Sequence, residues 1–227
     1  MRAMTNASRI AVLASGGGSN LQSIIDHFRT GPANKAGTVV LVGSNRADAG
    51  ALDRARSAGI TAHVMTDFTD GGALLLALRA ANVDLLVLAG YLRLVPDEVV
   101  HAFAGRMLNV HPSMLPAFGG HGMYGQRVHT AVIASGAKFT GVTVHFVNEA
   151  FDQGPIAAQW PVPVLPNDTP QTLAARVLRI EHVFFPAVIE AVASGAITVD
   201  AGNRTVGSIP AHSPFAVRDA QLFFPPA

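Results

Sequence analysis

The sequence predicts an α/β fold with a three-layer open sheet that is mostly parallel and has helices on both faces. Two observations predict it. Residues 9–14, 38–42 and 84–90 are short and almost continuously apolar, which is typical of parallel strands buried on both faces. Segments whose apolar residues recur at helical spacing alternate with these strands. Such strand–helix units build a parallel sheet with right-handed crossovers.

Glycine residues mark the ends of several elements in the first half of the chain. A glycine-rich run after residue 14 leads into a helix that carries Leu21, Ile24 and Ile25 on one face. Gly59 is a typical helix stop before the next strand. In chain order we expect strands at 9–14, 38–42, 60–64, 84–90 and 107–111, with further helices at 49–58, 71–81 and 97–103.

The second half carries two strand signals and one strong helix start. Apolar residues alternate with Thr143 and His145, as expected of a half-exposed strand. Residues 167–169 are polar capping residues and precede Pro170, which suits the first position of a long helix. In chain order we expect a helix at 127–135, strands at 140–147 and 157–164, the helix from 170, and a short strand at 197–199.

Composition limits the classes of function. The net charge of +1 gives no electrostatic reason to expect nucleic acid or an anionic membrane as partner. The chain has no cysteine, so disulfides and a cysteine nucleophile are excluded. Its apolar runs fall well short of the roughly 20 residues of a membrane span, and residues 1–8 lack the apolar core of a signal peptide. We expect a cytoplasmic protein that handles small molecules.

The sequence is organised around residues 107–116, where a buried strand ends in a proline-rich loop. Asn109 and His111 are two residues apart, so both side chains point to the same face of an extended backbone. Pro112 ends the strand at its carboxyl edge, where open α/β sheets bind ligands. An amide donor and a base that titrates near neutrality are thereby paired. The pattern also fits a strand end whose polar groups only satisfy loop backbone, and spacing alone leaves both readings open.

The glycine loop at Gly16, Gly17, Gly18, Ser19 and Asn20 lies between a strand and a helix. This arrangement aims free backbone N–H groups at an anion, helped by the helix dipole. The third glycine of a dinucleotide fingerprint is missing, and no Gly-Lys-Ser/Thr run follows. A single phosphate monoester therefore fits better than a nucleotide cofactor, while a tight turn that needs glycine only for its dihedral angles remains the alternative.

Several motifs stand together in an order that resembles the phosphoribosylglycinamide formyltransferases, which have a Rossmann-like fold. The similarity runs from about residue 10 to residue 197. It rests on Ser15-Gly16-Gly17-Gly18-Ser19-Asn20-Leu21-Gln22, Ser44-Asn45-Arg46-Ala47-Asp48, Leu88-Ala89-Gly90-Tyr91-Leu92-Arg93, Asn109-Val110-His111-Pro112-Ser113-Met114-Leu115-Pro116, His145-Phe146-Val147 and Asp152-Gln153-Gly154-Pro155.

The resemblance implies formyl transfer from 10-formyltetrahydrofolate, a co-substrate, to the amine of 5'-phosphoribosylglycinamide in de novo purine biosynthesis. It assigns a catalytic set and two binding sets. The catalytic residues would be Asn109, His111 and Asp152. The ribonucleotide would be bound by Gly16, Gly17, Gly18, Ser19, Asn20 and Glu181, and the folate by Leu92, Arg93, Leu94, Val95, Val147, Asn148, Glu149, Ala150 and Phe151.

The resemblance also implies a division of the chain. Residues 1–8 would be an N-terminal extension, residues 9–200 a single formyltransferase domain, and residues 201–227 a C-terminal tail. Within the domain, residues 9–105 would form the phosphate-binding half and residues 106–200 the folate-binding and catalytic half. We expect small-molecule substrates, no nucleic acid or membrane partner, and a monomer or homodimer.

The chemistry of this reaction suits the residues independently. An amine that attacks a formyl carbon makes a tetrahedral oxyanion, which Asn109 and a protonated His111 can stabilise by hydrogen bonds. Asp152 beside His111 would raise the pKa of the imidazole, because an opposite charge favours the protonated form. Histidine spacings match no short ligand motif, so we expect no metal. A formyltetrahydrofolate hydrolase is the nearest alternative function, and a non-enzymatic phosphate-binding module is a more distant one.

Overall fold

The computed structural model describes residues 7–30, 36–211 and 213–215. A seven-stranded sheet with the order β3-β2-β1-β4-β5-β6-β7 forms its centre. The first five strands in this order are parallel, whereas β6 pairs antiparallel with β5 and with β7. The strands are β1 (Ser8–Leu13), β2 (Gly37–Ser44), β3 (Thr61–Val64), β4 (Leu85–Leu88), β5 (Met107–His111), β6 (Phe139–Phe146) and β7 (Ile156–Pro163).

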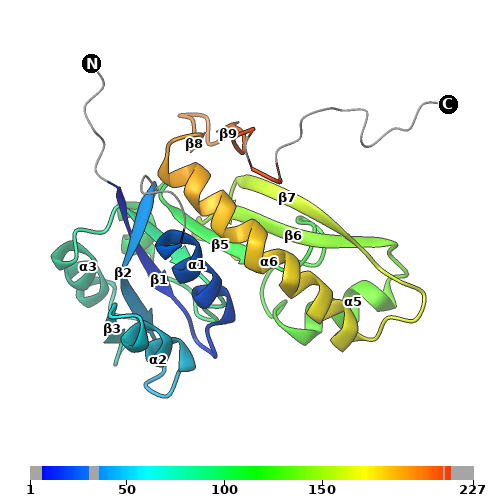
Figure 1. Cartoon of the computed structure of the whole chain (residues 1–227), viewed down its shortest axis with the longest axis horizontal. Helices are drawn as coiled ribbons and strands as arrows, with labels where there is room; N and C mark the ends of the chain where they lie inside the picture. The colour runs from blue at the N-terminus through cyan, green and yellow to red at the C-terminus, as the bar shows by residue number, and fades with distance from the viewer. Residues whose placement is uncertain (1–6, 31–35, 212, 216–227) are drawn as a thin grey trace.

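Helices cover both faces of this sheet, and α1 and α6 lie side by side across one of them (Figure 1). The longest helix, α6, begins at a capping box between Thr169 and Thr172 and has proline at its first position. The helices are α1 (Ser19–Arg29), α2 (Gly50–Ser57), α3 (Gly71–Ala80), α4 (Asp97–Ala102), α5 (Gln126–Ala134) and α6 (Pro170–Ala193).

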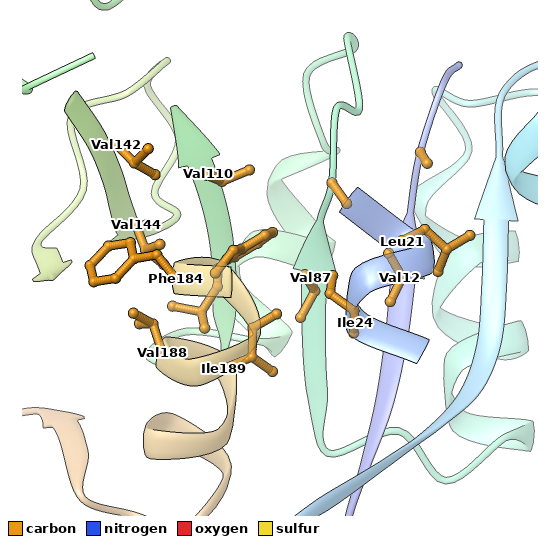
Figure 2. Close-up of a cluster of buried hydrophobic side chains, with 14 of the residues drawn as sticks. Val12, Leu21, Ile24, Val87, Val110, Val142, Val144, Phe184, Val188 and Ile189 are labelled. Atoms are coloured by element: carbon orange, nitrogen blue, oxygen red, sulfur yellow. The ribbon is translucent and has the colours of Figure 1, made fainter. Parts of the chain in front are cut away.

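The core is divided by the sheet, because successive residues of a strand point to opposite faces. Val12 of β1 faces α1 and α6, where Leu21 and Phe184 pack over the strands (Figure 2). Leu13, the next residue, belongs to the other cluster, with buried side chains of α3 and α4. The three-layer α/β architecture predicted from the sequence is therefore confirmed.

The expectation that β6 is half-exposed is wrong. Its polar residues Thr143 and His145 are buried, like the apolar residues between them. The apolar face packs under α6, and the loop after β5 covers the polar face. The Thr143 hydroxyl donates to the Ser113 carbonyl and accepts from the Leu115 N–H, which satisfies it without water.

The chain beyond α6 forms a hairpin of β8 (Ile197–Val199) and β9 (Thr205–Gly207). β9 thus lies within the range 201–227 that the sequence leaves as a tail. Phe215 also packs on the core, with its ring 4.9 Å from that of Trp160 and 5.1 Å from that of Phe184. Residues 1–6 of the expected extension and residues 216–227 of the tail lie outside the described residues. Within the described ranges no helix is long and apolar enough to span a membrane.

Candidate active site

The carboxyl ends of β1, β4 and β5 meet at one edge of the sheet. The strand order reverses between β1 and β4, and such a switch point leaves a crevice in which α/β proteins bind ligands. The glycine loop follows β1, residues 90–95 follow β4, and Pro112 follows β5. A cavity of about 660 Å³ opens here, and its lining includes Asn109, His111, Asp152 and Glu181.

The structure brings the three predicted catalytic side chains together around one carboxylate. Oδ2 of Asp152 accepts a hydrogen bond from the Gly120 N–H at 2.9 Å and lies 3.4 Å from Nδ1 of His111. Oδ1 accepts from Nδ2 of Asn109 at 3.4 Å. Only 10% of the Asp152 side chain is exposed. The carboxylate therefore acts on both neighbours with little screening by solvent.

The imidazole of His111 is held between two acceptors. Its Nε2–H donates to the Phe118 carbonyl at 2.8 Å, which leaves Nδ1 facing Asp152. Burial lowers the pKa of His111, and the charge of Asp152 and the Phe118 carbonyl offset this only in part. The net pKa is below the ordinary histidine value. As expected from the sequence, the charge of Asp152 raises the pKa of His111, but desolvation of the ring outweighs this attraction.

The loop carrying Asp152 has an uncommon backbone. Asp152 and Phe118 both have positive φ angles, 57° and 59°, a region that non-glycine residues rarely adopt. Burial alone would raise the pKa of the Asp152 carboxyl. Interaction with the imidazoles of His145 and His111 and the hydrogen bond from the Gly120 N–H together outweigh burial, so its pKa is lowered. Asp152 is thus ionised throughout the neutral range.

His145 belongs to this cluster although the sequence reasoning did not place it among the site residues. Its Nδ1–H donates to the Phe146 carbonyl at 2.8 Å, so Nε2 of the neutral ring is an acceptor. Nδ2 of Asn109 donates to that nitrogen at 3.1 Å. The two residues are direct partners in the register of β5 and β6. The motif His145-Phe146-Val147 is the sequence signal that could have pointed to His145, whereas its pairing with Asn109 is visible only in the structure.

Asn20 of α1 and Glu181 of α6 meet in the lining of the same cavity. Nδ2 of Asn20 donates to Oε2 of Glu181 at 2.6 Å, and both residues line the cavity. Glu181 is only 7% exposed, and burial raises its pKa in spite of the Asn20 hydrogen bond. Oδ1 of Asn20 is buried without a hydrogen-bond partner in the described chain. The pair therefore retains capacity to bind a polar ligand.

The rest of the glycine loop lies outside this cavity lining and is open to solvent. Gly18 is the N-cap of α1 with a φ of 74°, and a Cβ there would lie 2.8 Å from the Cα of Ala51. The N–H groups of residues 16–20 donate to no acceptor within the described part of the chain. Arg54, which the sequence reasoning did not single out, donates from Nε to the Gly17 carbonyl at 2.7 Å. The loop thus presents free donors beside a cation.

A second, smaller cavity of about 50 Å³ adjoins the first, and Asn109 and Asp152 line both. Leu92 lies on the larger cavity. Glu149 lies on neither: its carboxylate faces Nε2 of His101 at 3.0 Å, and 54% of its side chain is exposed. The predicted folate-binding residues that line the smaller cavity are Arg93, Leu94, Val95, Val147, Asn148, Ala150 and Phe151.

Within the described residues, no group of three or more histidine, aspartate or glutamate side chains is arranged to hold a metal ion.

Comparisons with known proteins agree with one another. The family model described as Formyl transferase matches residues 8–189. The chain is 47% identical over 191 residues to the chloroplastic phosphoribosylglycinamide formyltransferase of Arabidopsis thaliana, which covers 81% of this chain and 65% of that protein. It is 40% identical over 192 residues to the phosphoribosylglycinamide formyltransferase of Escherichia coli strain K12, with 82% and 87% covered.

Solved structures give the same result. Glycinamide ribonucleotide transformylase 1 from Symbiobacterium toebii superposes with a TM-score of 0.79 at 42% identity, covering 88% of this chain and 93% of that one. The chain spans less than two thirds of the length of the plant relatives that it matches, 65% of one and 60% of another. By sequence and by fold, the chain belongs to the formyl transferase family and, within it, to the phosphoribosylglycinamide formyltransferases.

Proposed function

We propose that this protein transfers the formyl group of 10-formyltetrahydrofolate to the amine of 5'-phosphoribosylglycinamide, a step of de novo purine biosynthesis. One observation carries the proposal. The cluster of Asn109, His111 and Asp152 lies where a large cavity adjoins a smaller one, and Asn109 and Asp152 line both. Such an arrangement suits an acyl transfer between two organic substrates, because both can reach the same polar cluster.

The ribonucleotide occupies the larger cavity in this proposal. Glu181 accepts hydrogen bonds from the ribose hydroxyls, and Asn20 holds the carboxylate in place. The free N–H groups of the glycine loop bind the phosphate at the start of α1. The pteridine of the folate lies against the smaller cavity, between the segment after β4 and the loop before Asp152.

Formyl transfer then needs one attack and one proton movement. The substrate amine attacks the formyl carbon, and the carbonyl electron pair moves to oxygen. In the ligand-free site, the two N–H groups of Asn109 donate to His145 at 3.1 Å and to Asp152 at 3.4 Å. In this proposal the longer bond, to Asp152, gives way to one with the oxyanion. Collapse breaks the bond to the folate nitrogen. One proton leaves the amine and one reaches that nitrogen, so the protons balance.

His111 serves as the carrier of that proton. Because Nε2–H is bound to the Phe118 carbonyl, the neutral ring takes the proton at Nδ1, directly or through a water. The carboxylate of Asp152 then faces a charged imidazolium at 3.4 Å and stabilises it. The lowered pKa of His111 suits this role, since the ring starts the cycle neutral.

A cytoplasmic location and a monomer or homodimer remain parts of this proposal, as does the absence of nucleic acid as a partner. Size-exclusion chromatography with light scattering, run at micromolar protein, distinguishes the monomer from the homodimer.

The test of function follows tetrahydrofolate release with and without the ribonucleotide. With 10-formyltetrahydrofolate alone, release should be negligible. On addition of phosphoribosylglycinamide it should rise steeply, in step with formylated product. Equal rates with and without the amine, with formate accumulating, would identify the protein as a hydrolase instead.

A further inference from the structure

His129 is a buried histidine that the formyl-transfer steps above do not use. It lies on α5 and is only 4% exposed, yet it borders the larger cavity. Its Nδ1 is enclosed by protein and has no hydrogen-bond partner within the described residues. Nε2 also has no hydrogen-bond partner among the described residues, but unlike Nδ1 it is not fully buried. The ring therefore presents Nε2 to the cavity.

The tautomer of this ring follows from the cost of burying an unpaired N–H. A proton on Nδ1 would leave a buried donor without an acceptor, which is rarer in proteins than a buried acceptor without a donor. A proton on Nε2 can instead be donated into the cavity. Burial, and secondarily the charge of His111, lower the pKa of His129. At neutral pH the ring is thus a neutral donor through Nε2–H.

The position of His129 indicates which part of the substrate it would contact. Its ring is near enough to His111 for the two to interact electrostatically. The helix that carries it packs against α6, which carries Glu181. In the proposed function the substrate amine lies at His111 and the ribose at Glu181. The group that joins amine and ribose is a carboxamide, whose oxygen is the hydrogen-bond acceptor on that stretch.

We propose that His129 is a further substrate-binding residue, whose Nε2–H donates a hydrogen bond to the carboxamide oxygen of phosphoribosylglycinamide. This inference rests on the proposed function. The contact would hold the short linker between amine and ribose and so orient the amine toward the formyl carbon.

Kinetics of three variants test the contact. His129→Leu should raise the KM for the ribonucleotide about 3- to 10-fold, the effect expected for one hydrogen bond to an uncharged oxygen, and leave the KM for the folate unchanged. His129→Gln should recover much of the loss, because its amide N–H can reach the place of Nε2. His182→Leu is the matched control, since His182 on α6 also has a buried, unpartnered ring nitrogen but does not border the cavity. It should leave both KM values unchanged.

A spectroscopic measurement on the wild-type protein keeps the test decisive if His129→Leu does not fold. In protein labelled with ¹⁵N-histidine, the ribonucleotide alone should shift the His129 Nε2 resonance and leave that of His182 in place. An unmoved His129 signal overturns the inference, as does an equal KM in wild type and His129→Leu or an equal loss in the Leu and Gln variants. Failure of the proposed function is a different result, namely no formylated product from the wild-type protein.

Discussion

Replacing Asp152 by asparagine tests the central electrostatic argument of the site. The change removes one negative charge and keeps the shape of the side chain. Asparagine also tolerates the positive φ of 57° at this position, whereas alanine would add backbone strain. The amide oxygen can still accept the Gly120 N–H. The fold should therefore survive, and the effect should fall on catalysis.

The magnitude follows from the distance between Asp152 and His111. Two opposite unit charges 3.4 Å apart attract by about 5 kcal/mol at an effective dielectric constant of about 20. At about 1.4 kcal/mol per factor of ten, this sets an upper limit of roughly 4000-fold on the loss in kcat. General acid–base groups typically contribute at least about 100-fold. We expect the loss in kcat to lie between these two limits, while the affinity for the ribonucleotide changes little.

Steady-state kinetics with varied ribonucleotide and saturating folate give both quantities. Asp200→Asn is the matched control, because Asp200 is a carboxylate of the β8–β9 turn, paired with Arg204 and remote from both cavities. Its kcat should equal that of the wild type. A kcat for Asp152→Asn within a factor of three of the wild type would refute the reasoning and leave Asp152 with a structural role only.

Three further predictions concern the loop, the proton carrier and metals. Gly18→Ala should lower the melting temperature by several degrees, since a Cβ there meets Ala51 at 2.8 Å and the φ is positive, whereas Gly16→Ala, with open space around it, should leave it unchanged in the same thermal scan. In an NMR titration of the ligand-free protein, His111 should titrate below the ordinary value of about 6.5 because burial lowers its pKa. Asp152→Asn should lower the midpoint further, because the carboxylate charge that stabilises the protonated ring in the wild type is removed. A higher midpoint in the variant would contradict this reasoning. Exhaustive chelation should leave turnover intact, and a loss restored by Zn²⁺ or Fe²⁺ would show that a metal takes part.

The fold could be predicted from the sequence because its signals are local. An apolar run such as the one that forms β4 can be buried on both faces only inside a layered sheet. Gly59 and Pro170 mark helix ends through their own backbone preferences. The burial of Thr143 in β6 could not be predicted, because it depends on a loop from another part of the chain that folds over it.

The candidate site was predictable in part for the same reason. Asn109 and His111 share a strand, so their common face follows from spacing alone. His145 reaches them only through the pairing of two strands whose register the sequence does not reveal. The motifs predict that Asp152 raises the pKa of His111. They do not predict the larger lowering by burial, because the extent of burial is set by the finished structure.

The pairing of β5 with β6 also bears on how such proteins can change over evolution. Asn109 and His145 face each other because of the ladder between these strands, so the connection between them does not set their distance. Beyond Gly120, whose N–H binds Asp152, residues can therefore be gained or lost in the connection without moving the pair. One residue inserted within β6 would turn His145 to the opposite face of the sheet. We expect relatives to vary in length after Gly120 and to keep the spacing inside both strands.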